Sequence, residues 1–348
     1  MTATTATTAT TATAMDRAAT PRSLAAGSVP LPAARGPLSE ALLAVLTGAA
    51  DTLPQTVGEP DPYGEDLQLA LHLAYELHYR PLPGVDSELE WDPEVLRFRR
   101  LLERVFLAAL RGDVLGGDDV DAVLEPLLLE PVDGTGPSWH LWRAGERGQL
   151  REYVAHRSVY HLKEGDPQSW VVPRLSGQAK ATLVSVQHDE YGAGRAERMH
   201  AQLFAEMMVE LDLDPAYGRY VDAAPAVTLA PVNLMSMAGL HRTLLGVAVG
   251  QFVMIEVTSS PGSRRLSAAF ARLSEGTAGR RFYDEHVEAD AVHEQLLRRG
   301  LRDLLAAEPG AAAGVVLGVQ AGLLLEERFG AHLLASWATG SSSLLAGG

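Results

Sequence analysis

The spacing of apolar residues most constrains the fold, because it follows the period of a helix almost throughout the chain. Leu42 and Leu46 share one face of an early segment, and Leu67, Leu71 and Ala74 share one face of the next. Two-residue alternation of apolar and polar residues, which is typical of half-buried strands, is nearly absent. The sequence therefore predicts an all-α protein.

Periodicity and helix-breaking residues give the expected helices. We expect helices over residues 38–52, 66–79, 93–111, 118–130, 153–164, 175–190, 196–211, 232–258, 277–298, 301–306 and 311–337. Pro261 and Gly262 are expected to break the chain after residue 258. The uncharged stretches 223–240 and 309–325 are interpreted as buried helices and not as membrane spans.

The chain divides into three regions. Residues 1–37 are Thr/Ala repeats followed by a Pro/Ala/Gly stretch, and we expect a disordered tail in which Met15 could be the true start. Residues 38–145 are expected to form accessory helices that cover a pocket or make a homodimer contact. Residues 146–348 are expected to form the main helical domain.

Composition restricts the partners and the metal ligands. The formal net charge is −15 and no basic stripe is visible, so we expect neither a nucleic-acid nor a membrane partner. The chain has no cysteine, which excludes disulfides, thiolate metal sites and a cysteine nucleophile. Any metal must therefore bind His, Asp and Glu. A chain without cysteine or a secretion signal is typical of a bacterial-type cytoplasm.

Residues 286–293 contain the pattern His-x3-Asp-x2-His. On a helix that turns about 100° per residue, offsets of four and seven place His286, Asp290 and His293 on one face. Two imidazoles and a carboxylate on one face are typical ligands of a first-row transition metal. The alternative is an exposed polar face, so the motif needs ligands from elsewhere in the chain.

Glu256 is a candidate for such a ligand. It stands near the end of the apolar run 244–257, where a carboxylate is costly to bury without a partner. The partner could be a metal or the following Arg264 or Arg265. If the helix ends early, Glu256 is simply exposed.

Residues 189–200 offer the remaining ligand candidates. Glu190 and His200 are ten residues apart, so they can share a metal only if the helix is interrupted, and Gly192 and Gly194 are where this would happen. Glu197 is the alternative, because Glu-x2-His with Asp290-x2-His293 is reminiscent of ferritin-like di-iron bundles. That alternative leaves His286 unexplained.

Other histidines fit a metal site less well. His156 and His161 lie five apart, about 140° around a helix, and are interpreted as structural or substrate-facing. Glu76 and His78 face opposite ways on a helix and are interpreted as structural. No third glycine follows Gly192 and Gly194 at the nucleotide-binding spacing, and no Gly-x-Ser-x-Gly occurs.

Taken in order, Asp-Glu-Tyr-Gly at 189–192, His200, Glu256 and the 286–293 motif resemble the haem-oxygenase-like dimetal oxidases, the iron-containing redox enzyme family. The resemblance spans roughly residues 150–340 and implies a bundle of about seven helices. It implies two iron(II) ions per chain, the second held more weakly, and O2 as co-substrate. The implied ligands are Glu190, His200, Glu256, His286, Asp290 and His293. Nine residues separate Glu190 from His200, where several members have six.

The resemblance also implies the reaction class. An oxidoreductase of this kind would act by N-oxygenation, desaturation or C–C cleavage on an amino-acid-like or carboxylate-bearing small molecule in natural-product biosynthesis. Arg264 and Arg265 could bind such a carboxylate, or they are solvated loop residues. An external electron donor is an open alternative partner.

Two other functions compete with the oxygenase. One is a non-catalytic binding protein with a look-alike or vestigial metal site, and the other is a hydrolase or an iron store. Asp189, Tyr191, Tyr283 and Glu288 are candidates for orienting a ligating histidine or carrying protons, although a structural role is the simpler interpretation for each.

Overall fold

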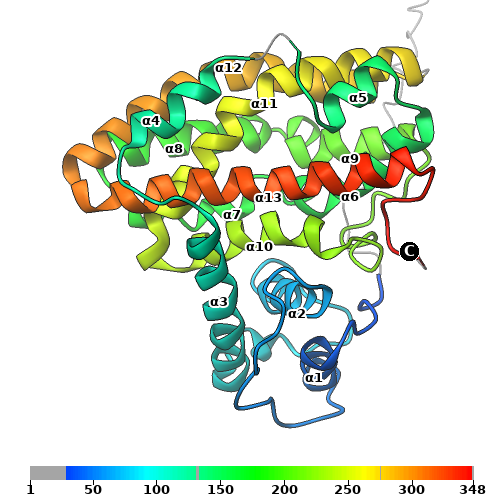
Figure 1. Cartoon of the computed structure of the whole chain (residues 1–348), viewed down its shortest axis with the longest axis vertical. Coiled ribbons are helices and arrows are strands. Elements are labelled where there is room, and N and C mark those ends of the chain that lie inside the picture. The colour runs from blue at the N-terminus through cyan, green and yellow to red at the C-terminus, as the bar shows by residue number, and fades with distance from the viewer. Residues whose placement is uncertain (1–28, 131–132, 275, 347–348) are drawn as a thin grey trace, which may run out of the picture.

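A computed structural model of the chain describes residues 29–130, 133–274 and 276–346, except for the side chains of residues 290–292. Within these residues the secondary structure is helical, with no strand, which confirms the predicted all-α class (Figure 1). The α-helices are α1 (Pro37–Leu46), α2 (Glu65–Glu76), α3 (Pro93–Asp113), α4 (Val120–Leu124), α5 (Pro137–Arg143), α6 (Arg147–His161), α7 (Asp166–Ser169), α8 (Gly177–Glu190), α9 (His200–Glu210), α10 (Ala226–Leu240), α11 (Leu245–Leu273), α12 (Ala278–Ala307) and α13 (Ala312–Ala338).

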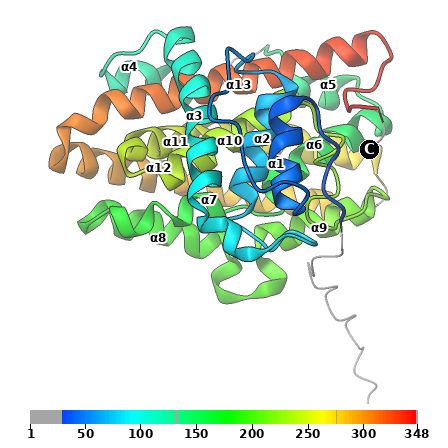
Figure 2. The ribbon, with the colours of Figure 1, turned by 90° about the horizontal axis from the view of Figure 1, so that it is seen from below.

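The helices form a main bundle and a smaller N-terminal group. Figure 1 shows α1, α2 and α3 below the bundle, and Figure 2 shows the same three helices from that side. Helix α10 contacts α2 as well as α11 and α13, so it joins the two groups. One apolar core runs through this junction, from Leu69 and Tyr75 on α2 to Leu229 and Leu234 on α10. Burying each such side chain contributes about 1.5–3 kcal/mol.

Helix α11 lies at the centre of the bundle, packed on both α12 and α13. Its contact with α13 depends on glycines that remove side-chain bulk. A Cβ added at Gly250 would lie 2.1 Å from the Val315 carbonyl oxygen, and one at Gly318 would lie 2.2 Å from the Val247 carbonyl oxygen. The Gly/Ala content of the last helix therefore serves close packing of two helix backbones.

The helix expected over 232–258 is two helices, which corrects that prediction. Helix α10 ends at Leu240, and α11 begins at Leu245 after a short 3-10 turn, Arg242–Leu244. The physical reason is a side chain from far away in the sequence. The Arg174 guanidinium donates to the carbonyls of Gly239 and Leu240, the latter at 2.7 Å, and so binds groups at the end of α10 that a continuing helix would use.

The break expected at Pro261 and Gly262 is wrong, because α11 continues through both residues to Leu273. A proline inside a helix costs about 3 kcal/mol, since it removes one hydrogen bond and crowds the preceding turn. The residues beyond it, including Leu266 and Phe270, are buried in the bundle. Their burial offsets the cost, so tertiary packing overrides the local signal. Residues 301–306 likewise belong to α12 and do not form a separate helix.

Of the expected tail, residues 29–37 are described. Residues 1–28, with Met15, lie outside the described residues. Arg35, however, is partly buried, pairs with Glu65 at 2.8 Å and donates to the Val221 and Ala224 carbonyls. The chain therefore joins the fold before residue 37.

By length and composition, two described segments could cross a membrane, Arg242–Leu273 and Pro309–Ala338. Core helices of soluble proteins meet the same criterion. The interpretation of the uncharged stretches as buried helices, and not as membrane spans, therefore stays a prediction.

Candidate metal centre

Two groups of buried carboxylate and imidazole ligands lie inside the bundle. The first group is Glu164, His200 and His286, and the second is Glu190, Glu256 and His293. Within each group, one ligand atom from each residue lies within 4.8 Å of the others. A first-row metal ion binds N and O ligands at about 2 Å, which spaces them by about 3–4 Å. Small side-chain movements would therefore close either group around an ion.

A break in the chain brings Glu190 and His200 together, at the place that the glycines predicted. Helix α8 ends at Glu190 and α9 begins at His200. Between them, Gly192, Ala193 and Gly194 all have positive φ, at 65°, 53° and 78°. A Cβ at Gly192 would lie 2.6 Å from the backbone of the following turn, so this turn needs a glycine.

Glu190 connects the two groups. Its Oε2 lies 2.9 Å from His200 Nδ1 in the first group, and its Oε1 lies 3.9 Å from His293 Nδ1 in the second. Glu190 is 5% exposed, whereas the alternative ligand Glu197 is exposed to solvent. The geometry therefore favours Glu190 over Glu197.

Helix α12 supplies one histidine to each group. His286 and His293 are seven residues apart on α12, as the motif predicted, and both are buried. His286 Nδ1–H donates to the Phe282 carbonyl at 2.7 Å, which turns Nε2 toward Glu164 Oε2, 3.7 Å away. The side chain of Asp290 lies outside the described residues, so Asp290 stays a predicted ligand.

Glu256 reaches the centre from α11. It is buried, and its Oε2 lies 3.1 Å from His293 Nδ1. The two arginines offered as its partners have other surroundings. Arg265 pairs with Glu130 and lies over the Trp139 ring, 4.2 Å from its centroid, while Arg264 is exposed. A role for either arginine in substrate binding stays a prediction.

Charges within the centre shift the pKa values of its histidines. Burial lowers the pKa of His293, but the hydrogen bond to Glu256 and the charges of Glu256 and Glu190 outweigh it and raise the pKa to about 9. Burial likewise opposes the charged form of His200, and Glu190 raises its pKa nevertheless. In the metal-free chain, protons on these imidazoles therefore supply the positive charge that a metal would bring.

The donor set fits iron. It consists of carboxylate oxygens and imidazole nitrogens, which suit a first-row ion of intermediate hardness. Glu164 Oε2, Glu190 Oε2 and His200 Nδ1 are buried and make no well-oriented hydrogen bond within the described residues. Such atoms are costly unless a partner is provided, and a cation between them would be that partner.

Glu164 was missed by the sequence reasoning, which used residues 153–164 only as a helix. Helix α6 ends at His161, and Glu164 follows in the turn before Gly165. His161 Nδ1 lies 2.8 Å from Glu164 Oε1 and so holds this carboxylate in place. The His161-x2-Glu164 spacing was the available signal, but such pairs are common in helical proteins without a metal.

The other polar candidates lie at varied distances from the centre. Asp189 Oδ2 lies 3.2 Å from His293 Nε2, in agreement with an orienting role. Tyr191 donates to Asp166 at 3.0 Å, Tyr283 packs in an apolar core, and Glu288 is exposed. His156 is structural, because it is buried between Thr228 and Ser343 at 2.7 and 3.0 Å.

The chain is similar to a known protein family. A family model described as "Iron-containing redox enzyme" matches residues 151–327, which span α6 to α13 and include every residue of the two groups. No curated protein matches the chain.

Proposed function

Because this chain belongs to the iron-containing redox enzyme family, we propose that it is a non-haem di-iron enzyme that uses O2 to oxidise a small molecule. The observation that carries this proposal is the position of Glu190. One carboxylate with an oxygen directed at each of two ligand groups would serve two neighbouring metal ions at once.

The residues divide naturally between two ions. Glu164, His200 and His286 would hold one ion, and Glu256 and His293 the other, with Glu190 shared between them. Two iron(II) ions held there would supply the electrons that reduce O2. Among the described side chains each group offers three or four ligands, and Asp290 stays a predicted further one. Each ion would thus keep open coordination positions.

Residues around the candidate centre orient its ligands and exclude water from it. The Phe282 carbonyl fixes the tautomer of His286, Asp189 orients His293, and His161 holds Glu164. Phe204 and Phe282 pack against the His161 ring and separate this side of the centre from solvent. Buried, oriented ligands of this kind support redox chemistry, because they keep water away from reactive intermediates.

The test is an anaerobic iron(II) titration of metal-free protein, followed by exposure to O2. We expect about two irons per wild-type chain and substrate-triggered O2 consumption. Glu164→Ala and Glu256→Ala remove one ligand from different groups, so each is expected to bind fewer than about 1.5 irons per chain. Glu197→Ala is the matched control, because Glu197 lies near the centre in sequence but is exposed.

The results separate the oxygenase from a non-catalytic binding protein. Unchanged iron binding in both Glu164→Ala and Glu256→Ala would contradict the proposed assignment of these residues as iron ligands. Wild-type protein that binds less than about half an iron, and consumes no O2 with any compound tried, would favour a binding protein with a look-alike site.

A further inference from the structure

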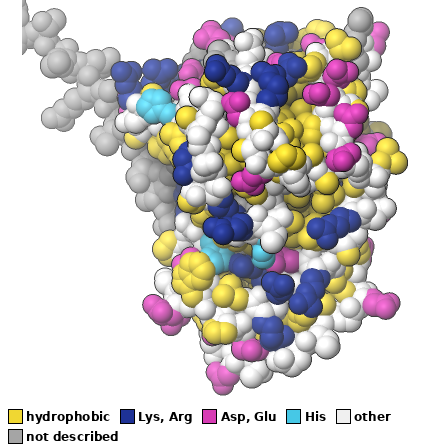
Figure 3. Space-filling view, turned by 90° about the vertical axis from the view of Figure 1, so that its left-hand side faces the viewer, with side chains coloured by type: hydrophobic (Ala, Val, Ile, Leu, Met, Phe, Trp, Pro, Cys, Tyr) yellow, Lys and Arg dark blue, Asp and Glu magenta, His cyan; other side chains and the backbone are white. Residues whose placement is uncertain are grey.

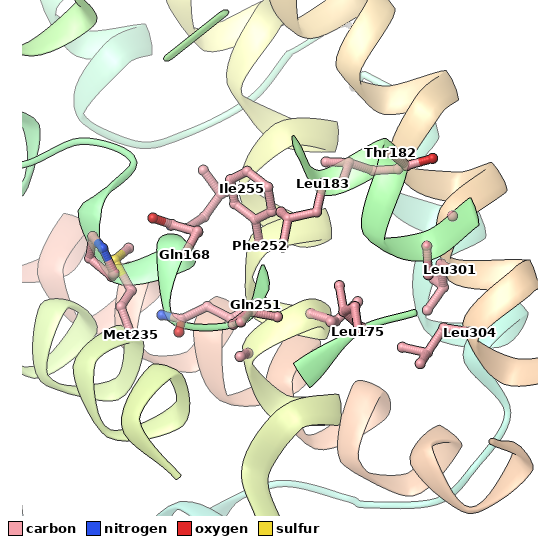
Figure 4. A pocket seen from close by; sticks show the side chains of 17 residues that line it. Gln168, Leu175, Thr182, Leu183, Met235, Gln251, Phe252, Ile255, Leu301 and Leu304 are labelled. Carbon is pink, nitrogen blue, oxygen red and sulfur yellow. The ribbon is translucent and has the colours of Figure 1, made fainter. Parts of the chain in front are cut away.

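A pocket lies beside the ligand groups, between α8, α11 and α12 (Figure 4). Its empty space is about 590 Å³, and this value includes space that is open to solvent. The same three helices carry Glu190, Glu256 and His293. Ile255, which lines the pocket, directly precedes Glu256, and Leu297 follows His293 by four residues, about one helical turn. The pocket therefore begins about one turn from the second ligand group.

The lining of this pocket is almost entirely hydrocarbon. None of the described residues that line it carries a charge. Its polar side chains are Gln168, Gln251 and Thr182. Figure 4 shows Gln168 and Gln251 on one side of the pocket and Leu301 and Leu304 on the other. The pocket thus has an amide end and a leucine end.

The amide end is the one close to the ligand groups. Gln168 is 6% exposed and its Nε2 donates to the Tyr160 hydroxyl at 3.2 Å. The centroid of the Tyr160 ring lies 5.1 Å from that of the His161 ring, and His161 Nδ1 lies 2.8 Å from Glu164 Oε1. Gln168 is therefore linked through Tyr160 and His161 to the first ligand group.

Gln168 also lacks a partner for its carbonyl. Its Oε1 is buried and has no hydrogen bond within the described part of the chain. Leaving such an acceptor unsatisfied costs about 1–3 kcal/mol. A ligand that places an N–H or O–H group at this end of the pocket would remove that cost.

The leucine end lies toward the far end of α12, on the left of Figure 1. Figure 3 views the molecule from this side, and hydrophobic side chains gather there among charged ones. This face of the molecule is therefore partly apolar.

We propose that this pocket holds the substrate of the proposed reaction, and that the substrate is an amphiphile with a medium-length hydrocarbon body and one small polar head. The body would lie among Phe252, Leu301 and Leu304, and the head at Gln168 beside the ligand groups. A free amino acid with a charged side chain is disfavoured, because that charge would be buried without a partner. Arg264 and Arg265 do not line the pocket. The proposal rests on the proposed function and narrows its substrate class.

The first test measures binding without O2, by calorimetry on metal-free and iron(II)-loaded protein. The probes are straight-chain primary amines and carboxylic acids of four to ten carbons, with lysine and arginine for comparison. Each buried methylene adds about fourfold in affinity, so Kd should fall about three- to fourfold per carbon until the pocket is full. The series that binds more tightly identifies the head group. A flat response in both series, or tighter binding of lysine or arginine, overturns the proposal.

The second test fills the pocket. Ala179 lines it, whereas Ala181 on the same helix is exposed. Ala179→Phe should weaken binding of the eight-carbon probe at least tenfold, and Ala181→Phe less than twofold. Ala248→Leu on α11 adds less bulk to the same space and replaces Ala179→Phe if that variant does not fold. Equal binding by the pocket and surface variants overturns the proposal.

Failure of this inference can be told apart from failure of the proposed function. If wild-type protein binds two irons and consumes O2 only with polar amino acids, the proposed function stands and the amphiphilic substrate is excluded. If hydrocarbon probes bind but iron does not, the pocket is not the substrate site of an iron enzyme.

Discussion

Two buried polar clusters lie side by side in this protein, and of the two, within the described residues, only one contains a lysine. Lys163 and Glu164 are consecutive residues, yet each belongs to a different cluster. Lys163 is fully buried, forms an ion pair with Glu76 of α2 and lies 4.0 Å from the centre of the Tyr79 ring. The other oxygen of Glu76 accepts from the Tyr217 hydroxyl at 2.6 Å.

The second cluster consists of the two ligand groups of the candidate metal centre, and its carboxylates have different neighbours. Within the described residues, no lysine or arginine pairs with Glu164 or Glu190, whose neighbours are histidines. A buried carboxylate needs a positive partner. The first cluster obtains it from Lys163, and the second needs either protons or an ion from outside. The difference between them separates a structural ion pair from a ligand site.

The largest expected effect is the loss of the structural cation. Lys163→Met leaves the buried Glu76 without its lysine, so we expect the free energy of unfolding of metal-free protein to fall by about 3–5 kcal/mol. Urea unfolding measures this. A Glu76→Leu/Lys163→Met double variant, which removes both charges, should recover most of the loss. A loss below about 1 kcal/mol in Lys163→Met would contradict the contrast between the clusters.

The next effect concerns pH at the same cluster. Burial lowers the pKa of His72, beside Glu76, from 6.5 to about 4. As pH falls from about 6.5 to 4, the unfolded chain binds a proton at this residue and the folded chain does not. The folded state therefore loses up to about 3 kcal/mol over this range and loses no more below pH 4.

His72→Gln removes this contribution. The difference in unfolding free energy between wild type and His72→Gln should therefore shift against the wild type as pH falls from 6.5 to 4. Urea unfolding at several pH values checks the slope. A difference that stays constant over this range would mean that His72 is not held neutral.

At the candidate metal centre, the hydrogen bond from His161 that holds Glu164 should control the affinity for iron. His161→Phe keeps the ring that stacks on Phe204 but removes the group that holds Glu164. Such supporting contacts are worth about 10–100-fold in metal affinity, or about 1.4–2.8 kcal/mol. His161→Gln retains a hydrogen-bond donor and should lose less than tenfold. Anaerobic iron titrations give both values, and equal losses would mean that the hydrogen bond is not the cause.

The smallest expected effect is on the stability of the metal-free centre. Glu190→Gln should change the unfolding free energy of metal-free protein by less than about 1 kcal/mol. Within the described residues its charged neighbours are histidines, and these can release a proton when Glu190 loses its charge, so no buried cation is left behind. Iron(II) at 100 times its Kd should stabilise the wild type by about 2.7 kcal/mol and this variant much less. Thermal unfolding with and without iron tests both statements. A large loss in the metal-free variant would make Glu190 structural.

The success of the sequence reasoning depended on how local each signal was. The all-α class and the placement of His286 and His293 on one helix follow from spacing within a few turns. The interruption before His200 was predictable, because Gly192 and Gly194 favour a conformation that helices do not use. Glu256 was recognisable as a carboxylate in an apolar run, and its burial beside His293 agrees with that reasoning.

Other features depended on distant partners. The end of α10 is set by Arg174, about 65 residues earlier in the chain. Helix α11 continues through Pro261 because α12 and α13 pack on it. Glu164 became a ligand candidate only when α6 was placed against α9 and α12, since its own segment resembles any helix end. The pocket likewise arises from three helices that are distant in sequence.

By itself the sequence determined the helical class, the absence of thiolate chemistry and most of the candidate ligands, because these follow from residue type and from spacing along one helix. Only the tertiary structure decided which ligands share a group, and that Glu190 connects the two groups. It also decided that Lys163 pairs with a carboxylate of α2, whereas the neighbouring Glu164 faces histidines. The physical reason is that burial and charge pairing depend on what surrounds a residue in space, and spacing along the chain does not carry that information.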